Sequence, residues 1–410
     1  MRILMIAPLP FFQARGAPFQ VYHRARVLGE MGHQVDLVVY HVGDDIALPN
    51  VRLRRAWRLP FVKSVKVGPS VAKFPLDALL FLKAGSLLLY NRYDCLHTHL
   101  EAGFFGATLG RLARLPHVYD MHDDLAETLA SSKFTRNPFL IRMMRGVVRM
   151  TLRSADSIII VYPELQHVVD TLAPGKPTTL IHNIAVTAGE QETLSEEQRS
   201  ARINQVRREL DLPDESRVLL YTGTFEAYQG LDALIDSIPA VLTHFPHAMY
   251  VLVGGMPDQI ETVRARARAL GVEHAVRLPG RRPPQEMPAF MALADVLLSP
   301  RSAGTNAPLK LFTYLEAGKP ILATDIASNT QILTSDAALL VPYSASALAE
   351  GAIQLLSDAD LCEALAQHAQ SLAGRYSNEM FTTRTLEAYQ ALAATHAPID
   401  KAESSSLFVR

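Results

Sequence analysis

Short apolar runs alternate along the chain with longer segments whose apolar residues recur at helical spacing. The runs RILMIAPLP and HQVDLVVYH enclose PFQVYHRARVLGEMG, whose spacing predicts a helix that ends at Gly32. Strand–helix–strand units of this kind predict a mostly parallel sheet that is covered by helices. Further runs continue the alternation in the first half of the chain: YDCLHTH, HVYDMHDD and ADSIIIVY.

The same alternation begins again after a polar stretch at residues 186–207, which is rich in Glu, Gln and Ser. This stretch is typical of a linker or of the exposed start of a helix. We expect one domain at residues 1–190 and a second at 191–385, with a C-terminal helix at 386–410 that crosses back to the first domain and ends in a frayed tail. The second series of runs is RVLLYTGTF, HAMYVLVGG, AVRLPG, ADVLLSP, PILATD and AALLVP.

Composition narrows the class of protein. With 410 residues, of which 49% are hydrophobic and 20% charged, the chain is long enough for two soluble globular cores. We expect a cytoplasmic protein, because the chain has no uninterrupted apolar run of about 18 residues and no signal-peptide pattern. Its only cysteines, Cys95 and Cys362, provide neither a disulfide framework nor a cysteine metal cluster.

Positive charge gathers in two segments of the first half, although the formal net charge is only −1. Residues 46–76 and 128–155 carry thirteen cations between them and no acid. Apolar residues are mixed with these cations, so an anionic membrane surface is the partner that we expect there. The alternative for the second segment is a helix that packs its apolar stripe on the sheet and leaves its arginines in water. The cations central to this hypothesis are Lys63, Lys66, Lys73, Arg142, Arg145 and Arg149.

The stretch SAGTNAPLKLFTYLEAGKPILATD, at residues 302–325, holds the first candidate site. It follows a strand-like run, and Pro308 suits the first turn of a helix that begins there. Ligands of parallel sheets bind beyond the carboxyl ends of the strands, where loop amides and the helix dipole favour an anion. Lys310 adds a full positive charge at this place, so we expect it to bind a phosphate rather than to be an ordinary surface lysine.

Taken in order, the motifs resemble those of the GT-B glycosyltransferases, and especially of family 4, whose members are retaining enzymes that use nucleotide sugars. The resemblance implies an α/β fold with two Rossmann-like domains that face each other across a cleft. The second domain would hold a UDP- or GDP-linked sugar, and the first would hold the acceptor. No metal or other cofactor is implied, because the departing phosphate would itself assist the acceptor hydroxyl. The likeness is carried by ARGAPFQVYHRARVLGEMGHQVDLVVYH, YDCLHTH, HVYDMHDDL, YTGTFEAYQGLDALIDSI, LVGG, LPGR, LADVLLSP and LEAGKPILATD.

The resemblance also assigns site residues in both domains. His122 would reach the donor sugar and Lys310 the diphosphate, and these two are the catalytic candidates. Asp123 and Asp124 are candidates for orienting an acceptor hydroxyl. The donor-binding candidates are Gly16, Gly223, Thr224, Gly254, Gly280, Arg281, Arg301, Gly304, Thr305, Asn306, Thr313 and Glu316.

The chain departs from the family pattern at two pairs of positions. Thr305 and Thr313 stand where the family has two glutamates, and Glu316, one helical turn further on, either replaces the second glutamate or only occupies the surface. Thr224 and Gln229 stand where the family has an arginine and a lysine that face the diphosphate.

The second departure removes two cations that the family uses. Neutralisation of the diphosphate must then come from Lys310, with Arg301 or Arg281 as its partner.

Other readings follow from these departures. The chain could be an inactive scaffold subunit that binds nucleotide sugars, or a nucleotide-sugar epimerase on the same architecture. The spacing of His97 and His99 resembles that of metal ligands, but a third ligand is not evident, so zinc is not expected. The sugar, the base and the acceptor, whether a glycan, a lipid or a small molecule, are left open, and nucleic acid is not an expected partner.

Overall fold

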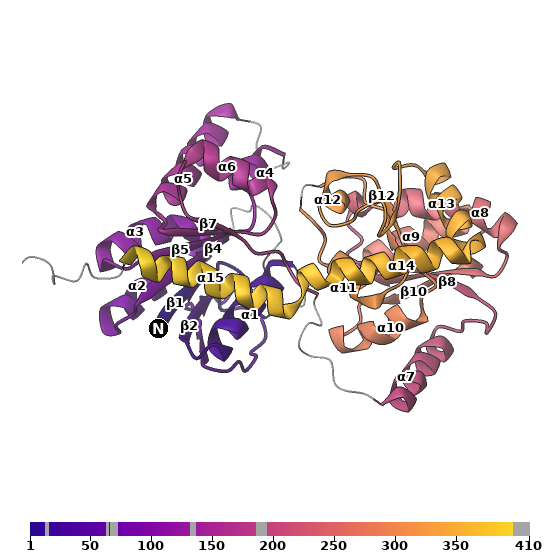
Figure 1. The fold of residues 1–410 in the computed structure, drawn as a ribbon, viewed down its shortest axis with the longest axis horizontal. Helices are drawn as coiled ribbons and strands as arrows, with labels where there is room; N and C mark the ends of the chain where they lie inside the picture. Colours follow the sequence, from indigo (N-terminus) through magenta and orange to yellow (C-terminus); the bar gives the residue numbers. More distant parts are fainter. Residues whose placement is uncertain are drawn as a thin grey trace, which may run out of the picture. The chain divides into compact units, whose positions relative to one another are not determined.

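The computed structural model describes residues 1–12, 16–62, 65, 73–131, 137–185, 195–304 and 306–396. The chain divides into two compact units (Figure 1). The first unit contains Met1–His182 and the segment that begins at Thr382, and the second unit is Asn183–Phe381. The tail that we expect to be frayed, at residues 401–410, lies outside the described residues.

A seven-stranded parallel sheet forms the centre of the first unit, in the order β3-β2-β1-β4-β5-β6-β7. The chain first builds outward from β1 to β2 and β3, and it then returns to place β4 on the other side of β1. Ligands of open parallel sheets bind at such a switch point, beyond the carboxyl ends of the strands. The strands are β1 (Arg2–Ile6), β2 (Gln34–Val39), β3 (Val51–Arg55), β4 (Cys95–His99), β5 (His117–Met121), β6 (Ser157–Ile160) and β7 (Thr178–Leu180).

The helices of the first unit bury apolar residues against this sheet. Helix α3 packs against α2, α5, β4 and β5, so α2, α3 and α5 form one continuous layer. The last helix, α15, has buried residues at helical spacing, among them Phe381, Thr385 and Leu392. The helices are α1 (Gly16–Glu30), α2 (Lys73–Tyr90), η1 (Leu100–Ala102), α3 (Gly103–Ala113), α4 (Leu125–Ser131), α5 (Pro138–Ser154), α6 (Glu164–Leu172) and α15 (Asn378–His396).

The second unit repeats this plan with six parallel strands, in the order β10-β9-β8-β11-β12-β13. Its switch point lies between β8 and β11, which are neighbours in the sheet although β9 and β10 separate them in the chain. The strands are β8 (Arg217–Gly223), β9 (Ala248–Gly254), β10 (Val276–Gly280), β11 (Val296–Ser299), β12 (Ile321–Thr324) and β13 (Leu339–Val341). The α-helices are α7 (Glu196–Glu209), α8 (Leu231–His244), α9 (Pro257–Ala269), α10 (Met287–Leu293), α11 (Lys310–Ala317), α12 (Ala327–Thr330), α13 (Ala345–Ser357) and α14 (Ala359–Ala373); the 3-10 turns are η2 (Ala227–Gln229), η3 (Glu273–Ala275), η4 (Pro284–Glu286) and η5 (Gly374–Tyr376).

The predicted alternation of strands and helices is confirmed in both units. Part of the polar stretch at residues 186–207 lies outside the described residues, and its second half forms α7, which begins with a capping box between Ser195 and Gln198. Two edge strands, β3 and β7, were not predicted, because β3 carries three arginines and β7 has only three residues. None of the described helices is long and apolar enough to cross a membrane.

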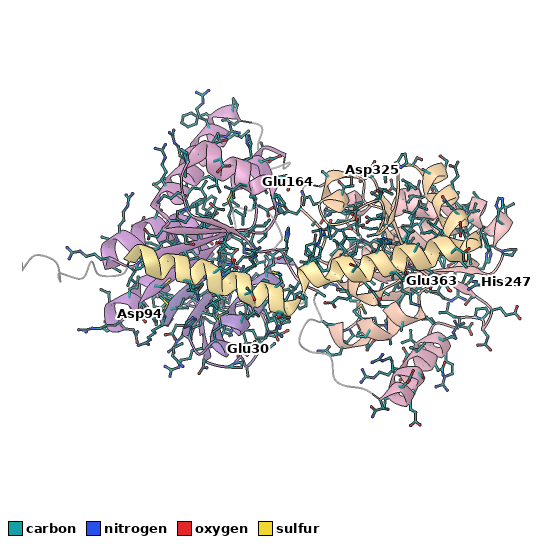
Figure 2. All side chains as sticks on the ribbon, in the orientation of Figure 1. Glu30, Asp94, Glu164, His247, Asp325 and Glu363 are labelled. Atoms are coloured by element: carbon teal, nitrogen blue, oxygen red, sulfur yellow. The ribbon has the colours of Figure 1, made fainter. Side chains whose placement is uncertain are left out.

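Labelled side chains identify the two edges of each sheet in Figure 2. Asp94 and His247 directly precede β4 and β9, so they lie at the amino edges of the two sheets. Glu164 follows β6 and Asp325 follows β12, so they lie at the carboxyl edges. The site candidates of the second unit also cluster at a carboxyl edge, because they follow β8, β9, β10 and β11.

Candidate active site

Lys310 connects the two sides of the switch point in the second unit. It opens α11, two residues later than Pro308 indicated. Its Nζ lies 3.9 Å from the centre of the Tyr221 ring, and it donates a hydrogen bond of 3.4 Å to Oε1 of Gln229. Tyr221 belongs to β8 and Gln229 to the turn that follows, so the lysine reaches from the β11 side of the sheet to the β8 side.

Arg301 follows β11 and is the second cation of this site. Its guanidinium lies 5.2 Å from the centre of the Tyr228 ring and donates to the backbone oxygen of Asn306 at 2.8 Å. Position 304 has a φ of +124°, which favours glycine, and its Cα lies so close to Arg301 that an added Cβ would come 2.5 Å from Nη2 of the guanidinium. The loop therefore holds the buried guanidinium in place.

The two cations form a site that lacks a compensating carboxylate. Burial, with the neighbouring charge of Arg301, lowers the pKa of Lys310 well below its usual range, and burial also lowers the pKa of Arg301. Neither side chain makes an ion pair with an acidic residue in the described part of the chain. An anionic ligand would relieve this unfavourable burial, so the site is suited to stabilising negative charge.

Other donor-binding candidates lie at the ends of the neighbouring strands. Gly223, Gly254 and Gly280 end β8, β9 and β10, and Thr224 directly follows β8. Gly254 has a φ of +129°, and a Cβ there would lie 1.8 Å from the oxygen of Gly223, so strand packing alone requires a glycine. Arg281 is exposed, and no contact between described residues joins it to the cation pair.

The positions that depart from the family pattern lie near the same loop. Thr313 is half-buried on α11, and Glu316 lies one turn further on with an exposed side chain. Partial desolvation raises the pKa of the Glu316 carboxyl. Thr305 lies outside the described residues, and Asn306 is half-buried beside Arg301. Donor binding by these residues stays a prediction.

In the first unit, His122 follows β5 and belongs to a buried polar cluster. Its Nε2 lies 3.0 Å from Nδ1 of His99 and 3.5 Å from Oδ1 of Asp120. Oδ2 of Asp120 accepts a hydrogen bond of 3.0 Å from Nε of Arg24, which keeps the pKa of Asp120 well below its usual range. Burial lowers the pKa of His122, so the imidazole is neutral near neutral pH.

His97, His99 and Asp120 form a group in which one ligand atom of each residue lies within 4.8 Å of the others. The sequence does not reveal this third residue, because Asp120 belongs to β5 and comes beside His99 only through the strand register. A dication at this place would face the guanidinium of Arg24, which already pairs with Asp120. The donor set therefore fits a metal poorly, and the expectation that none is needed stays a prediction.

The remaining candidates of the first unit have mixed surroundings. Asp124 caps α4, because its Oδ1 accepts a hydrogen bond of 2.9 Å from the backbone nitrogen of Ala126. Asp123 is half-buried beside it. Gly16 opens α1 with a φ of +23°, and a Cβ there would have no atom within 4 Å. The assigned roles of these three residues stay predictions.

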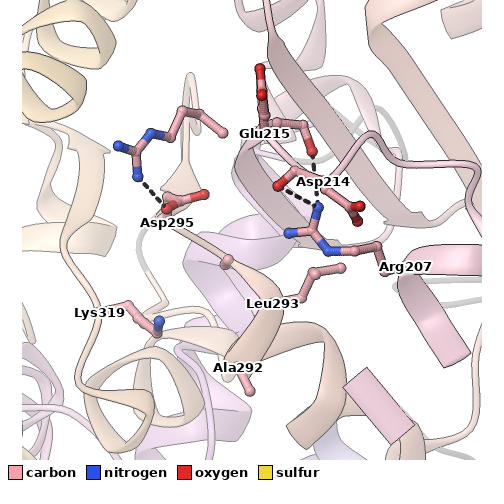
Figure 3. A pocket seen from close by; sticks show the side chains of 10 residues that line it. Arg207, Asp214, Glu215, Ala292, Leu293, Asp295 and Lys319 are labelled. Carbon is pink, nitrogen blue, oxygen red and sulfur yellow. Dashed lines mark hydrogen bonds and ion pairs between the residues drawn. The ribbon is translucent and has the colours of Figure 1, made fainter. Parts of the chain in front are cut away.

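Figure 3 shows a hollow of the second unit, and the residues that line it place it at the opposite edge of the sheet. It is lined by Arg207, Arg217, Asp295 and Lys319, close to the amino ends of β8 and β11. Two of its arginines already have partners, because Arg217 pairs with Asp295 at 3.3 Å and Arg207 donates to backbone oxygens. This hollow is therefore separate from the cation pair at the carboxyl edge.

Family comparisons agree with the two units. Residues 14–188 match the family described as Glycosyltransferase Family 4, and residues 202–372 match Glycosyl transferases group 1. With the two parallel α/β units, these matches define a glycosyltransferase of the GT-B fold, which confirms the fold and the enzyme class expected from the sequence. Within that class, the two family matches and the similar proteins support the family 4 type.

Similar proteins cover nearly the whole chain. The phosphatidyl-myo-inositol mannosyltransferase of Mycobacterium leprae is 25% identical over 408 residues, which are 98% of this chain and 100% of that protein. The sucrose-phosphate synthase of Thermosynechococcus elongatus superposes with a TM-score of 0.74 at 17% identity, over 96% of this chain and 99% of that one. Anabaena HepE in complex with UDP-glucose superposes with a TM-score of 0.72 at 18% identity, over 95% of this chain and 100% of that one. The two structural likenesses show the shared fold.

Proposed function

We propose that this glycosyltransferase moves a hexose, with retention, from a UDP- or GDP-linked donor to a hydroxyl of a lipid or lipid-linked acceptor. The pair of half-buried Lys310 and buried Arg301 at the switch point, which has no acidic ion-pair partner among the described residues, is the observation that carries the proposal. Such a pair suits a diphosphate. HepE, which shares the fold, binds UDP-glucose.

The cations act on charge that develops as the donor reacts. The bond between the anomeric carbon and the diphosphate oxygen breaks, and a bond from that carbon to the acceptor oxygen forms on the same face. The acceptor proton passes to the departing diphosphate, so no protein nucleophile is needed. Lys310, held by Tyr221 and Gln229, stabilises the negative charge on the leaving group. His122 contacts the sugar from the first unit.

The lipid part of the proposal rests on the helical layer of α2, α3 and α5. Phe74, Leu82 and Leu89 are exposed along α2, at a spacing that places them on one stripe of the helix. Leu112 at the end of the neighbouring α3 is also exposed. The sequence did not single out this stripe on α2, and its apolar character suits a membrane interface.

Helix α5 adds cations to the same layer. Its Val148 and Leu152 are buried, so the helix does pack an apolar stripe on the body of the unit, as the alternative to membrane contact required. Other apolar side chains nevertheless stay exposed beside the arginines. The exposed residues are Phe139, Met143 and Met150, with Arg142, Arg145 and Arg149. This combination suits an anionic lipid surface, and the Mycobacterium leprae relative is named for a phosphatidyl-inositol acceptor.

The lysines of the sequence hypothesis contribute less to the argument. Lys63 and Lys66 lie outside the described residues. Lys73 pairs with Glu101 at 3.0 Å, which leaves it less available to lipid phosphates. The arginines of α5 are therefore the better positions for a test.

Donor binding is tested with Lys310→Ala, and Lys319→Ala at the opposite edge of the same sheet is the matched control. Calorimetry with UDP and GDP, followed by transfer assays with a panel of nucleotide sugars, should show turnover lowered by about 10²-fold or more for Lys310→Ala, because one positioned charge contributes about 3 to 4 kcal/mol. If Lys310→Ala stays within about threefold of the wild type, the diphosphate assignment is wrong.

Membrane binding is tested by co-sedimentation with vesicles. Binding to anionic vesicles at low salt should weaken with added salt and with the triple change of Arg142, Arg145 and Arg149 to Glu, whereas neutral vesicles should bind little. A second variant, in which Lys63, Lys66 and Lys73 are changed to Glu, shows how much of the vesicle binding depends on the first cationic segment and how much on α5. If the wild-type protein ignores anionic vesicles at low salt, a soluble acceptor replaces the lipid in the proposal.

A further inference from the structure

Helix α15 brings two polar side chains from the end of the chain to the cluster around His122. Thr385 and Tyr389 lie one turn apart, and both are buried. Thr385 Oγ1 accepts a hydrogen bond from Nη1 of Arg24, and the hydroxyl of Tyr389 lies 2.6 Å from Nδ1 of His97. The helix thus contacts the two residues that flank the carboxylate of Asp120.

The surroundings of Tyr389 determine where His97 carries its proton. Burial raises the pKa of Tyr389 well above its usual range, so its hydroxyl stays protonated, and we assign it as the donor to Nδ1 of His97 because Nε2 of that ring faces the carboxylate of Asp120. A neutral His97 must then carry its own proton on Nε2, which lies 3.6 Å from Oδ2 of Asp120. Oδ2 therefore accepts a hydrogen bond from Nε of Arg24, while the protonated Nε2 of His97 faces it at the longer distance of 3.6 Å.

The other carboxylate oxygen determines the tautomer of His122. One proton lies between Nδ1 of His99 and Nε2 of His122, which are 3.0 Å apart. On His99 this proton would face Oδ2, which already has a donor in Arg24, but on His122 it faces Oδ1 at 3.5 Å. Oδ1 has no hydrogen-bond partner among the described residues, so a proton on Nε2 of His122 satisfies the buried carboxylate better.

We propose that Thr385 and Tyr389 are positioning residues, which act through Arg24, His97 and Asp120 to hold His122 with its proton on Nε2. The inference rests on the proposed function, because it concerns the histidine that contacts the sugar. With the proton on Nε2, Nδ1 of His122 is the ring atom left as an acceptor for a sugar hydroxyl, and it has no hydrogen-bond partner among the described residues. The network positions that acceptor and contributes no group that reacts.

The first experiment compares Tyr389→Phe with Tyr93→Phe in the full chain. Tyr93 is also a buried tyrosine of the first unit, but its hydroxyl donates to Asp36, away from His122. Tyr389→Phe should lower kcat on the order of tenfold, with the KM for the nucleotide sugar within about twofold of the wild type. The same kcat loss in both variants, or none in Tyr389→Phe, would show that the hydroxyl only stabilises the fold.

A second comparison applies the same logic to the other side chain. Thr385→Val removes the acceptor for Arg24, and Thr383→Val, at an exposed position of the same helix, is its matched control. We expect reduced kcat only for Thr385→Val. Thr385→Ser keeps the hydroxyl and should restore most of the activity, which a purely steric role of the methyl group would not allow.

A spectroscopic readout keeps the inference testable without turnover. Nitrogen NMR of ¹⁵N-histidine-labelled protein, assigned with a His122→Gln variant, should show the wild-type His122 protonated at Nε2 and a mixture of tautomers in Tyr389→Phe. Protonation at Nδ1 in the wild type would overturn the inference. If the tautomer is as expected but no nucleotide sugar is turned over, the proposed function fails and the network stands.

Discussion

Two buried histidines of the first unit make its stability depend on pH. Burial lowers the pKa to about 3 in both His23 and His117, and the neighbouring charges of Arg26 and Arg24 lower the pKa of His23 further. The ring of His117 lies against Gly106, where even an added Cβ would come within 2.2 Å of Nε2, so the protonated ring has no room for water. Acidification should therefore unfold this unit, because protons bind the unfolded chain first.

The sign and size of the effect follow from these pKa values. The unfolded histidines titrate near 6.5, so between about pH 6.5 and pH 3 the unfolded state binds more protons and the folded state loses stability as the pH falls. For a pKa of about 3, each histidine lowers the free energy of unfolding by roughly 2 kcal/mol between pH 7 and pH 5. The two together account for about 4 kcal/mol.

The assay uses the single tryptophan of the chain, Trp57, which lies in the first unit and reports its unfolding. Urea titrations followed by Trp57 fluorescence give the free energy of unfolding at pH 7 and pH 5. In His117→Gln the difference between the free energies of unfolding at pH 7 and pH 5 should be smaller by roughly 2 kcal/mol, whatever the variant does to stability at pH 7. The matched control replaces the exposed His167 by Gln. If both variants show the wild-type pH difference, the argument from burial is wrong.

Four other predictions test the candidate site and the sheet of the second unit that carries it. Arg301→Gln should weaken UDP or GDP binding by about tenfold in calorimetry, because a buried charge that faces the diphosphate is lost; unchanged affinity would remove Arg301 from the site. His122→Ala should abolish most transfer while nucleotide affinity stays within about twofold, since His122 lies in the other unit; an equal loss of affinity would contradict this placement. Gly254→Ala should lower the free energy of unfolding of the second unit by about 3 kcal/mol, measured by urea titration with circular dichroism, because its Cβ would lie 1.8 Å from the oxygen of Gly223. Nucleotide affinity should fall as the pH rises through a range below that of an ordinary lysine, since the pKa of Lys310 is lowered, and Lys310→Arg should flatten this profile.

Local sequence patterns predicted most of the fold. Strands such as β1 and β9 are buried on both faces, so they appear in the sequence as continuous apolar runs with turn residues at their ends. The edge strand β3 is half-buried, and its arginines stand among apolar residues. This pattern indicates a surface segment as long as its pairing with β2 is unknown. Apolar periodicity detects burial, and edge strands have little of it.

The candidate site was predicted only where its residues share a loop. Arg301 and Lys310 flank the same glycine-containing turn, so their proximity follows from the sequence. Tyr221 and Gln229 reach Lys310 through the pairing of β8 with β11, which no local pattern specifies. Asp120 reads as an ordinary strand residue for the same reason, because only the register with β4 places it beside the histidines.

The return of α15 to the first unit has a consequence for biosynthesis. A nascent chain exposes Arg24 and Asp120 to the ribosome exit long before Thr385 is made, since 361 residues separate Arg24 from Thr385. The second unit is one continuous segment, Asn183–Phe381, so it is able to fold while the first unit still lacks the part of its core that begins at Thr382. The first unit, which is synthesised first, is therefore completed only when α15 has been made. A chain that ends before Thr382 would have a complete second unit and an incomplete first unit, which would need chaperones to stay soluble.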